Sequence, residues 1–108
     1  MRGRITLDRQ FQGWRGIAHG GIAIALLDEA MAHACAAAGF RGLTASLATR
    51  FRAPVPLGRP LDMYGEVRWI RRGVLGLYAR VCDGERILAE GEGHFVAKGE
   101  AAPLDGPR

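Results

Sequence analysis

The stretch HGGIAIALLDEAMAHACAAA, from His19 to Ala38, decides the fold of this chain. Two glycines lead into about five turns of residues with high helix propensity, and Gly39 is a suitable residue to end the helix. The stretch is apolar on almost every side, which is typical of a buried helix rather than a surface helix. Asp28 and Glu29 interrupt the apolar run. Because a buried unpaired carboxylate is costly, these two residues require an explanation.

Five segments outside the helix show the period-two alternation that predicts β-strands. Turn residues separate them, including the prolines and glycines of 54–60 and the Asp83–Gly84 pair. Small residues recur on one side of the last segment, which would let the helix approach the sheet closely. The expected strands are 5–11, 43–52, 61–71, 74–82 and 86–98.

The order of these elements, β-α-β-β-β-β, predicts an α+β fold with an antiparallel five-stranded sheet. A single sheet can bury a helix this apolar only if the sheet curls around it. We expect one domain, residues 1–98, followed by a flexible C-terminal tail, residues 99–108.

The composition is that of a globular protein, with 48% hydrophobic and 24% charged residues. The net charge of +4 comes from arginine, since Lys98 is the only lysine, and it fits either an ordinary solvated surface or attraction of a phosphorylated ligand. No basic run is interleaved with aromatic residues, so nucleic-acid binding is not expected. Cys35 and Cys82 have no CxxC spacing and are expected to be free thiols. Without a signal-peptide pattern or a membrane-spanning apolar run, we expect a cytoplasmic protein.

The start of the helix is the first candidate site. Gly20 and Gly21 leave backbone N–H groups open to a ligand, at the end of the helix where the dipole favours negative charge. Such groups can stabilise the oxyanion of a reacting carbonyl or bind a phosphate. The glycines are equally typical of a tight turn into a closely packed helix, and the residues alone leave both interpretations open.

Asp28 is the second candidate, as a nucleophile or general base in a partly desolvated cleft. The alternative is a carboxylate that points to water or to an arginine. Glu29 can pair with His33 one turn later, which is a structural role. Asp28 follows Gly20 by eight residues, or about 12 Å along the helix axis. One carbonyl cannot contact both, so if both act, they come from two antiparallel copies of the helix across a twofold axis.

Several other polar residues are weaker candidates. His19 is expected to fix the start of the helix, and Thr44 and Ser46 carry hydroxyls that can orient a water molecule or the substrate. Arg71 and Arg72, at a turn, can meet phosphates, although turn arginines are usually only solvated. No metal site is expected because the histidines are scattered, and no phosphate-loop, dinucleotide or nucleophile-elbow motif is present.

Three segments together resemble the PaaI-type family of hotdog-fold acyl-CoA thioesterases. They are Phe11-Gln12-Gly13-x-x-Gly16-x-x-His19-Gly20-Gly21, Leu26-Leu27-Asp28-Glu29-Ala30, and Thr44 with Phe51-x-x-Pro54-Val-Pro56-Leu-Gly58. The resemblance covers residues 5–97 and implies the hotdog fold, in which a five-stranded sheet wraps around one helix. It also implies a homodimer or homotetramer that hydrolyses acyl-CoA thioesters without a metal or cofactor.

Carried over to this chain, the resemblance implies that Asp28 is the catalytic carboxylate and that Gly20 of the other subunit supplies the oxyanion N–H. Thr44 is then the hydroxyl that assists hydrolysis. Some members have Asn or Gln six places before the histidine, where this chain has Gly13. Two alternatives stay open: a hotdog acyl-CoA hydratase or dehydratase, and an acyl-CoA-binding protein without catalytic activity. The remaining expected substrate contacts are His19, Gly21, Gln12, Arg71 and Arg72.

Overall fold

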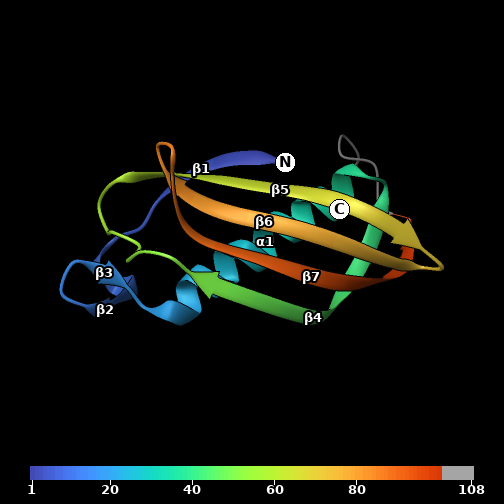
Figure 1. Ribbon diagram of the computed structural model, residues 1–108, viewed down its shortest axis with the longest axis horizontal. Helices are drawn as coiled ribbons and strands as arrows, with labels where there is room; N and C mark the ends of the chain where they lie inside the picture. Colours follow the sequence, from blue (N-terminus) through green and yellow to red (C-terminus); the bar gives the residue numbers. More distant parts are fainter. Residues whose placement is uncertain (101–108) are drawn as a thin grey trace.

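A computed structural model describes residues 1–100 of the chain as one curled antiparallel sheet around a single α-helix (Figure 1). The order of strands in the sheet is β1-β5-β6-β7-β4, and each neighbouring pair is antiparallel. The α+β fold expected from the sequence is therefore confirmed. The helix is α1 (Gly20–Ala37), and the strands of the sheet are β1 (Arg2–Thr6), β4 (Phe40–Phe51), β5 (Pro60–Arg71), β6 (Val74–Asp83) and β7 (Arg86–Glu100).

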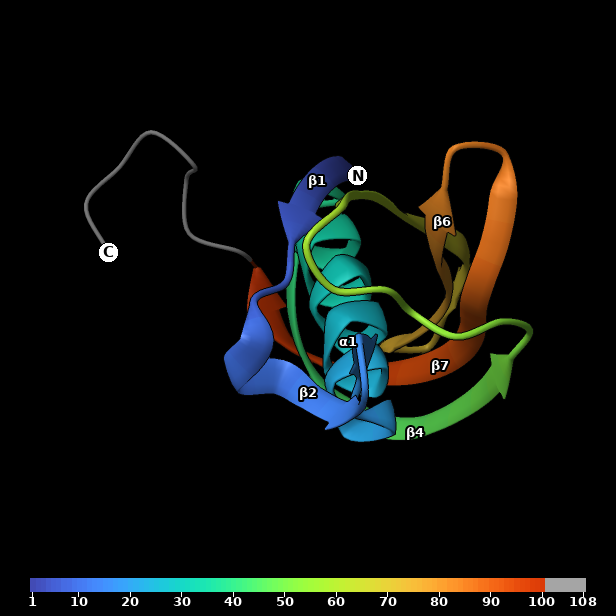
Figure 2. The ribbon, with the colours of Figure 1, turned by 90° about the vertical axis from the view of Figure 1, so that its left-hand side faces the viewer.

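Glycines on the sheet let α1 lie close to the strands. Side-chain carbons at Gly65 of β5 and Gly93 of β7 would each lie 2.8 Å from atoms of the helix, the carbonyl carbon of Ala30 and the sulfur of Met31. Seen from the end, the sheet curves around the helix, so that the core lies between them (Figure 2). The expectation that small residues on β7 permit a close approach is confirmed.

The helix is buried on one side only, which corrects the expectation of a helix buried all round. Its core side is formed by Ala23, Leu26, Leu27, Ala30, Met31, Ala34 and Cys35. The opposite side is exposed although it is partly apolar, and Ile24 is 37% exposed there. With a mean hydropathy of 1.3 over 18 residues, α1 has the length and composition of a membrane span, and its packing against the sheet accounts for the apolar residues of the buried side.

The N-terminal strand lies earlier than expected. It ends at Thr6, because the Asp8 side chain accepts the N–H of Gln10 and starts a 3-10 turn, η1 (Arg9–Phe11). The segment expected to be a loop then forms a small hairpin, β2 (Gln12–Trp14) and β3 (Ile17–Ala18). At the other end, β7 continues to Glu100, two residues beyond the expected end of the domain. The rest of the expected tail, 101–108, lies outside the described residues.

Candidate functional site

The first turn of α1 presents one free backbone donor. The ring of His19 caps the helix, since its Nδ1 accepts the N–H of Gly21 at 3.0 Å. Within residues 1–100, no hydrogen bond uses the N–H of Gly20, which is exposed to solvent. The structural role expected for His19 is therefore seen directly, and of the two glycines Gly20 is the one with a donor available to a ligand.

The β2–β3 hairpin is seated against this turn. A side-chain carbon at Gly13 would lie 2.8 Å from Cα of His19, so any larger residue there would require the hairpin or the start of the helix to shift. The Oε1 atom of Gln12 accepts the N–H of Gly16 at 3.1 Å and closes the hairpin loop. Gln12 is thus engaged inside the hairpin, and its expected contact with the substrate stays a prediction.

Asp28 of α1 and Thr44 of β4 meet where the helix contacts this strand. The hydroxyl of Thr44 donates to Oδ1 of Asp28 at 2.7 Å. Asp28 is half-buried and Thr44 is exposed, so the pair is open to a ligand or a water molecule. One carboxylate oxygen is held by the hydroxyl, and the carboxylate as a whole is an acceptor that can take a proton or attack a carbonyl.

A β-bulge brings Thr44 to this position. The pairing register between β4 and β7 shifts between Thr44 and Ser46, which leaves Ala45 as the extra residue. Simple alternation placed Thr44 on the face opposite Leu47, whereas the bulge turns Thr44 towards the helix and leaves Leu43, 61% exposed, on the outer face. The alternating sequence contains no signal for this bulge.

Other polar residues named in the sequence make no contact with the Asp28–Thr44 pair. Ser46 faces outward and its hydroxyl lies 2.8 Å from Nδ1 of His94, so of the two strand hydroxyls only Thr44 reaches Asp28. Glu29 pairs with His33 at 3.1 Å, as expected. These contacts separate the structural polar residues of this region from the Asp28–Thr44 pair.

Arg71 and Arg72 lie at the β5–β6 turn, at the end of the molecule where α1 ends rather than where it begins (Figure 1). Arg72 has a positive φ of 50° in this turn, and the guanidinium of Arg71 lies 5.7 Å from the centre of the Trp69 ring. The structure therefore does not bring these arginines together with Gly20 of the same chain. Their contact with CoA phosphates stays a prediction.

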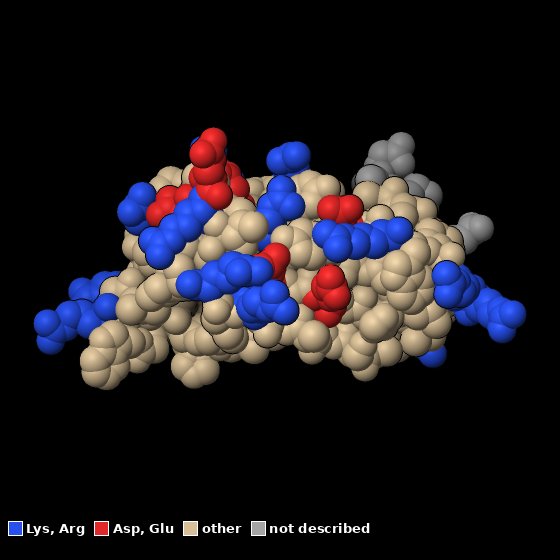
Figure 3. Space-filling model, in the orientation of Figure 1, with Lys and Arg blue, Asp and Glu red and all other residues tan. Residues whose placement is uncertain are grey.

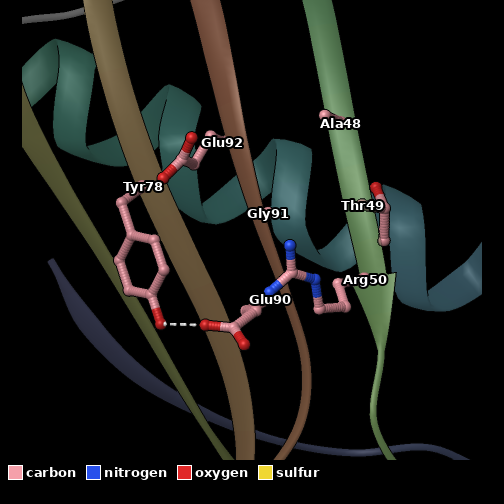
Figure 4. Close-up of a pocket in the computed structure, with 7 residues that line it drawn as sticks. All are labelled: Ala48, Thr49, Arg50, Tyr78, Glu90, Gly91 and Glu92. Carbon is pink, nitrogen blue, oxygen red and sulfur yellow. Dashed lines mark hydrogen bonds between the residues drawn. The ribbon is translucent and has the colours of Figure 1, made fainter.

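The outer face of the sheet carries Arg and Glu side chains side by side (Figure 3). A shallow pocket there contains Tyr78, whose hydroxyl donates to Glu90 at 2.9 Å (Figure 4). Hydrogen bonds from Arg52 and then from Tyr78 hold the pKa of Glu90 below its ordinary value. Burial, followed by the bond to Glu90, raises the pKa of Tyr78. These paired charges form a structural network that includes neither Asp28 nor Thr44.

Comparison with known proteins agrees with this architecture. The family model described as the thioesterase superfamily matches residues 15–90. A crystal structure of a thioesterase superfamily protein is 33% identical, with a TM-score of 0.84, and the match covers 88% of this chain and 47% of that protein. This chain thus spans about half the length of that relative. No curated protein sequence matches significantly.

Two more distant structures share the fold. A hypothetical thioesterase from Streptococcus pneumoniae, solved with coenzyme A, is 17% identical with a TM-score of 0.86; the match covers 92% of this chain and 81% of that one. The PaaI protein of the E. coli phenylacetic acid degradation operon is 21% identical with a TM-score of 0.84, and the match covers 93% and 73%. With the family model spanning more than half of the sequence, the chain belongs to the thioesterase superfamily and has its hotdog fold.

Proposed function

We propose that this protein is an acyl-CoA thioesterase that hydrolyses its substrate to a free acid and CoA. The observation that carries the proposal is the Asp28–Thr44 pair, in which a half-buried carboxylate on a largely apolar helix is held by a hydrogen bond from an exposed hydroxyl. Membership of the thioesterase superfamily supports the reaction, and the coenzyme A bound to the related S. pneumoniae protein supports the carrier.

We further propose that the active site is formed by two copies of the chain. Gly20 and Asp28 are both on α1, about 12 Å apart along its axis, so one carbonyl cannot touch both in a single copy. Strand β4 is the edge of the sheet beside α1 and has a free row of backbone groups that can pair with another strand. Ile24 and Phe51 leave apolar surface exposed along the same side. A twofold axis beside β4 would cover this surface and bring Gly20 of one copy to Asp28 of the other.

In this arrangement the N–H of Gly20 donates a hydrogen bond to the carbonyl oxygen of the thioester and stabilises its developing negative charge. Asp28 of the other copy takes a proton from a water molecule while the oxygen of that water molecule attacks the carbonyl carbon. The carbon–sulfur bond then breaks, and the proton passes to the CoA thiolate. Direct attack by the Asp28 carboxylate, followed by hydrolysis of the resulting anhydride, uses the same groups. In both routes Thr44 orients the carboxylate.

The hydratase alternative needs a histidine that acts as an acid or base at the acyl chain. His19, which directly precedes Gly20, uses its Nδ1 atom to cap the helix, and this favours a structural role for that ring. The binding-protein alternative makes no use of a carboxylate held by a hydroxyl on an apolar helix. The thioesterase proposal accounts for both features.

Substitution of Asp28 by Asn tests the proposal, with Glu29→Gln as the matched control on the neighbouring residue. Release of free CoA thiol from acyl-CoA esters is followed with DTNB. We expect Asp28→Asn to lower kcat by about 10²–10⁴-fold, the usual contribution of a positioned base, and Glu29→Gln to stay within about threefold, because exposed pairs such as Glu29–His33 contribute little. Near-normal turnover in Asp28→Asn, or no thiol release by the unmodified protein from any ester, would contradict the proposal.

A further inference from the structure

Another pocket on the outer face of the sheet lies far from the Asp28–Thr44 pair. It has a volume of about 480 Å³ and is formed by β1, β5, β6 and the turn between β6 and β7. In the order β1-β5-β6-β7-β4, these strands are at the edge of the sheet opposite to β4 (Figure 1). The surface beside β4 that a second copy would cover therefore does not include this pocket.

Three side chains from three strands form a row along one side of this pocket. Arg2 of β1 and Arg80 of β6 are the direct cross-strand neighbours of Tyr64 on β5. Gly65 and Ala79 face the helix and the core. Because side chains alternate along a strand, Tyr64 and Arg80 point outward. The guanidinium carbons of the two arginines lie 5.0 and 4.1 Å from the centre of the tyrosine ring, so they are at most about 9 Å apart.

Contact with the ring leaves both guanidinium groups able to bind a ligand. A guanidinium stacks on an aromatic ring with its flat face, whereas its N–H donors point outward in its plane. Within residues 1–100, neither Arg2 nor Arg80 forms an ion pair. In the same part of the chain, no hydrogen bond uses the hydroxyl of Tyr64. The row thus presents two positive charges and a hydroxyl to the pocket.

The carboxylates beside the row are paired with other arginines. Glu90 is the cross-strand neighbour of Arg80 on β7, but it pairs with Arg52. Asp62 lies two residues before Tyr64 on the same face of β5, and it pairs with Arg4 at 3.1 Å. The positive charges of the row are therefore not neutralised by these carboxylates.

The far end of the pocket is acidic. Asp62 lines the pocket two residues along β5 from Tyr64, a distance of about 6.6 Å. The exposed residue Glu85 lies beyond it, in the turn between β6 and β7. Carboxylates at this end can accept hydrogen bonds from hydroxyl groups of a ligand, and they repel a second negative charge. The pocket therefore complements a molecule with an anion at one end and hydroxyl groups at the other.

We propose that this pocket binds the phosphate monoester of a compact hydroxylated molecule, such as a sugar phosphate, as a ligand separate from the thioester substrate. A phosphate monoester carries a charge of about −1.5 to −2 at pH 7 and has three acceptor oxygens, which match two guanidinium groups and the Tyr64 hydroxyl. The pocket volume lies within the usual range for small-molecule sites, about 300–1,000 Å³, and leaves room for an organic group beyond the phosphate. The inference does not depend on the proposed reaction, because the pocket and Asp28 lie on opposite sides of the sheet.

Calorimetric titration of the full chain with ribose 5-phosphate tests the site. We expect saturable binding, with ribose at least about 100-fold weaker and inorganic phosphate about tenfold weaker. Arg2→Gln and Arg80→Gln should each weaken binding by at least about tenfold, the usual effect of losing a hydrogen bond to a charged group. The matched control is Arg50→Gln, which removes the same charge from the outer face of β4, outside the pocket. It should change the affinity less than about twofold.

Saturable binding of neither ribose 5-phosphate nor inorganic phosphate would overturn the inference, and so would an equal loss of affinity in Arg50→Gln. Equal affinities for the two ligands would refute the assignment of the acidic end to a hydroxylated group. Arg80→Lys keeps the positive charge and guards against a folding defect. Because lysine binds a phosphate as a point charge rather than as a fork, this variant should still bind severalfold more weakly than the unmodified protein, and full affinity would contradict the role of the guanidinium.

The nucleotide end of CoA is another source of a phosphate monoester, and 3′,5′-ADP is the probe that represents it. We expect 3′,5′-ADP to bind more weakly than ribose 5-phosphate, because its second phosphate would meet the acidic end of the pocket. Arg2→Gln should change KM for acyl-CoA esters less than about twofold. Tighter binding of 3′,5′-ADP, or a rise of KM beyond about fivefold in Arg2→Gln, would assign the pocket to CoA and contradict a separate ligand. The thiol-release test of Asp28 is unaffected by either result.

Discussion

Gly65 is the position where the helix and the sheet leave least room, and its replacement by alanine should be costly. A Cβ atom at this position of β5 would lie 2.8 Å from the carbonyl carbon of Ala30 and closer still to the carbonyl oxygen. The obstacle is helix backbone, which cannot rotate away as a side chain can. To reach an ordinary separation of at least 3.4 Å from the carbonyl carbon, the helix and strand must part by about 0.6 Å, from 2.8 to 3.4 Å, and they must part further to clear the carbonyl oxygen.

Overpacking of this kind costs about 1–3 kcal/mol, and a backbone obstacle places Gly65→Ala near the upper end. Replacing glycine in a strand returns about 0.5–1 kcal/mol, so the net loss should be about 2 kcal/mol. For a domain of this size that lowers Tm by about 8–16 °C, measured by circular dichroism or calorimetry. Ala30 is two residues from Asp28, so the same displacement should reduce thiol release by about tenfold.

Gly76→Ala is the matched control on the neighbouring strand β6. Its Cβ atom would lie 2.6 Å from Cζ2 of Trp69, an even closer approach than at Gly65. The obstacle here is the ring of a tryptophan that is 40% exposed and can turn away into solvent. We expect a loss below about 1 kcal/mol. If Gly65→Ala is as stable as the unmodified protein, or if Gly76→Ala is the more destabilised of the two, the close helix–sheet contact does not limit stability as argued.

Two further substitutions probe the polar contacts. Thr44→Val removes the hydroxyl that donates to Asp28 and should lower kcat about 10–100-fold with little change in Tm. Thr44→Ser keeps the hydroxyl and should keep most of the activity. Equal activity in the two variants would contradict the role of the hydroxyl. Glu90→Gln should destabilise the fold by roughly 1 kcal/mol at pH 7, seen in urea unfolding, because it weakens the bonds to Arg52 and Tyr78. The folded-state pKa of Glu90 lies below its ordinary value of 4.5, so this contribution is present above pH 4.5 and disappears as the pH falls through the lowered pKa. If the difference in unfolding free energy between Glu90→Gln and the unmodified protein persists undiminished at lower pH, the Glu90 carboxylate is not its source.

Much of the fold follows from patterns that are local in the sequence. The uninterrupted helix propensity of α1 and the alternation of the later strands predict the α+β architecture. Gly91 and Gly93 also identify, from their size alone, one strand that the helix approaches closely. These features are predictable because backbone periodicity and steric size act over a few residues.

The site depends on features that sequence patterns do not contain. The bulge at Ala45 reverses the face of Thr44 without any break in the alternation of residue types. The β2–β3 hairpin forms where glycines indicated only a loop, because it is held by contacts with the helix start at His19. The one-sided burial of α1 also could not be predicted from the sequence, because an apolar side of a helix can pack against the same chain or against a second copy.

Subunit mixing tests the two-copy active site most directly. Gly20→Pro removes only the N–H donor: proline is well tolerated at the first residue of a helix, and His19 already has the extended backbone (φ −58°, ψ 139°) required before proline. Asp28→Asn removes the carboxylate. Each variant alone should release thiol at least about 10²-fold more slowly than the unmodified protein.

When the two variants are mixed and their subunits exchange, each mixed dimer pairs an intact Gly20 from one copy with an intact Asp28 from the other. An equimolar mixture should therefore recover about one quarter of the unmodified thiol-release activity, since half of the dimers are mixed and each has one of two sites intact. If exchange is verified by mass spectrometry and the mixture stays as inactive as its components, Gly20 and Asp28 do not act across two copies of the chain.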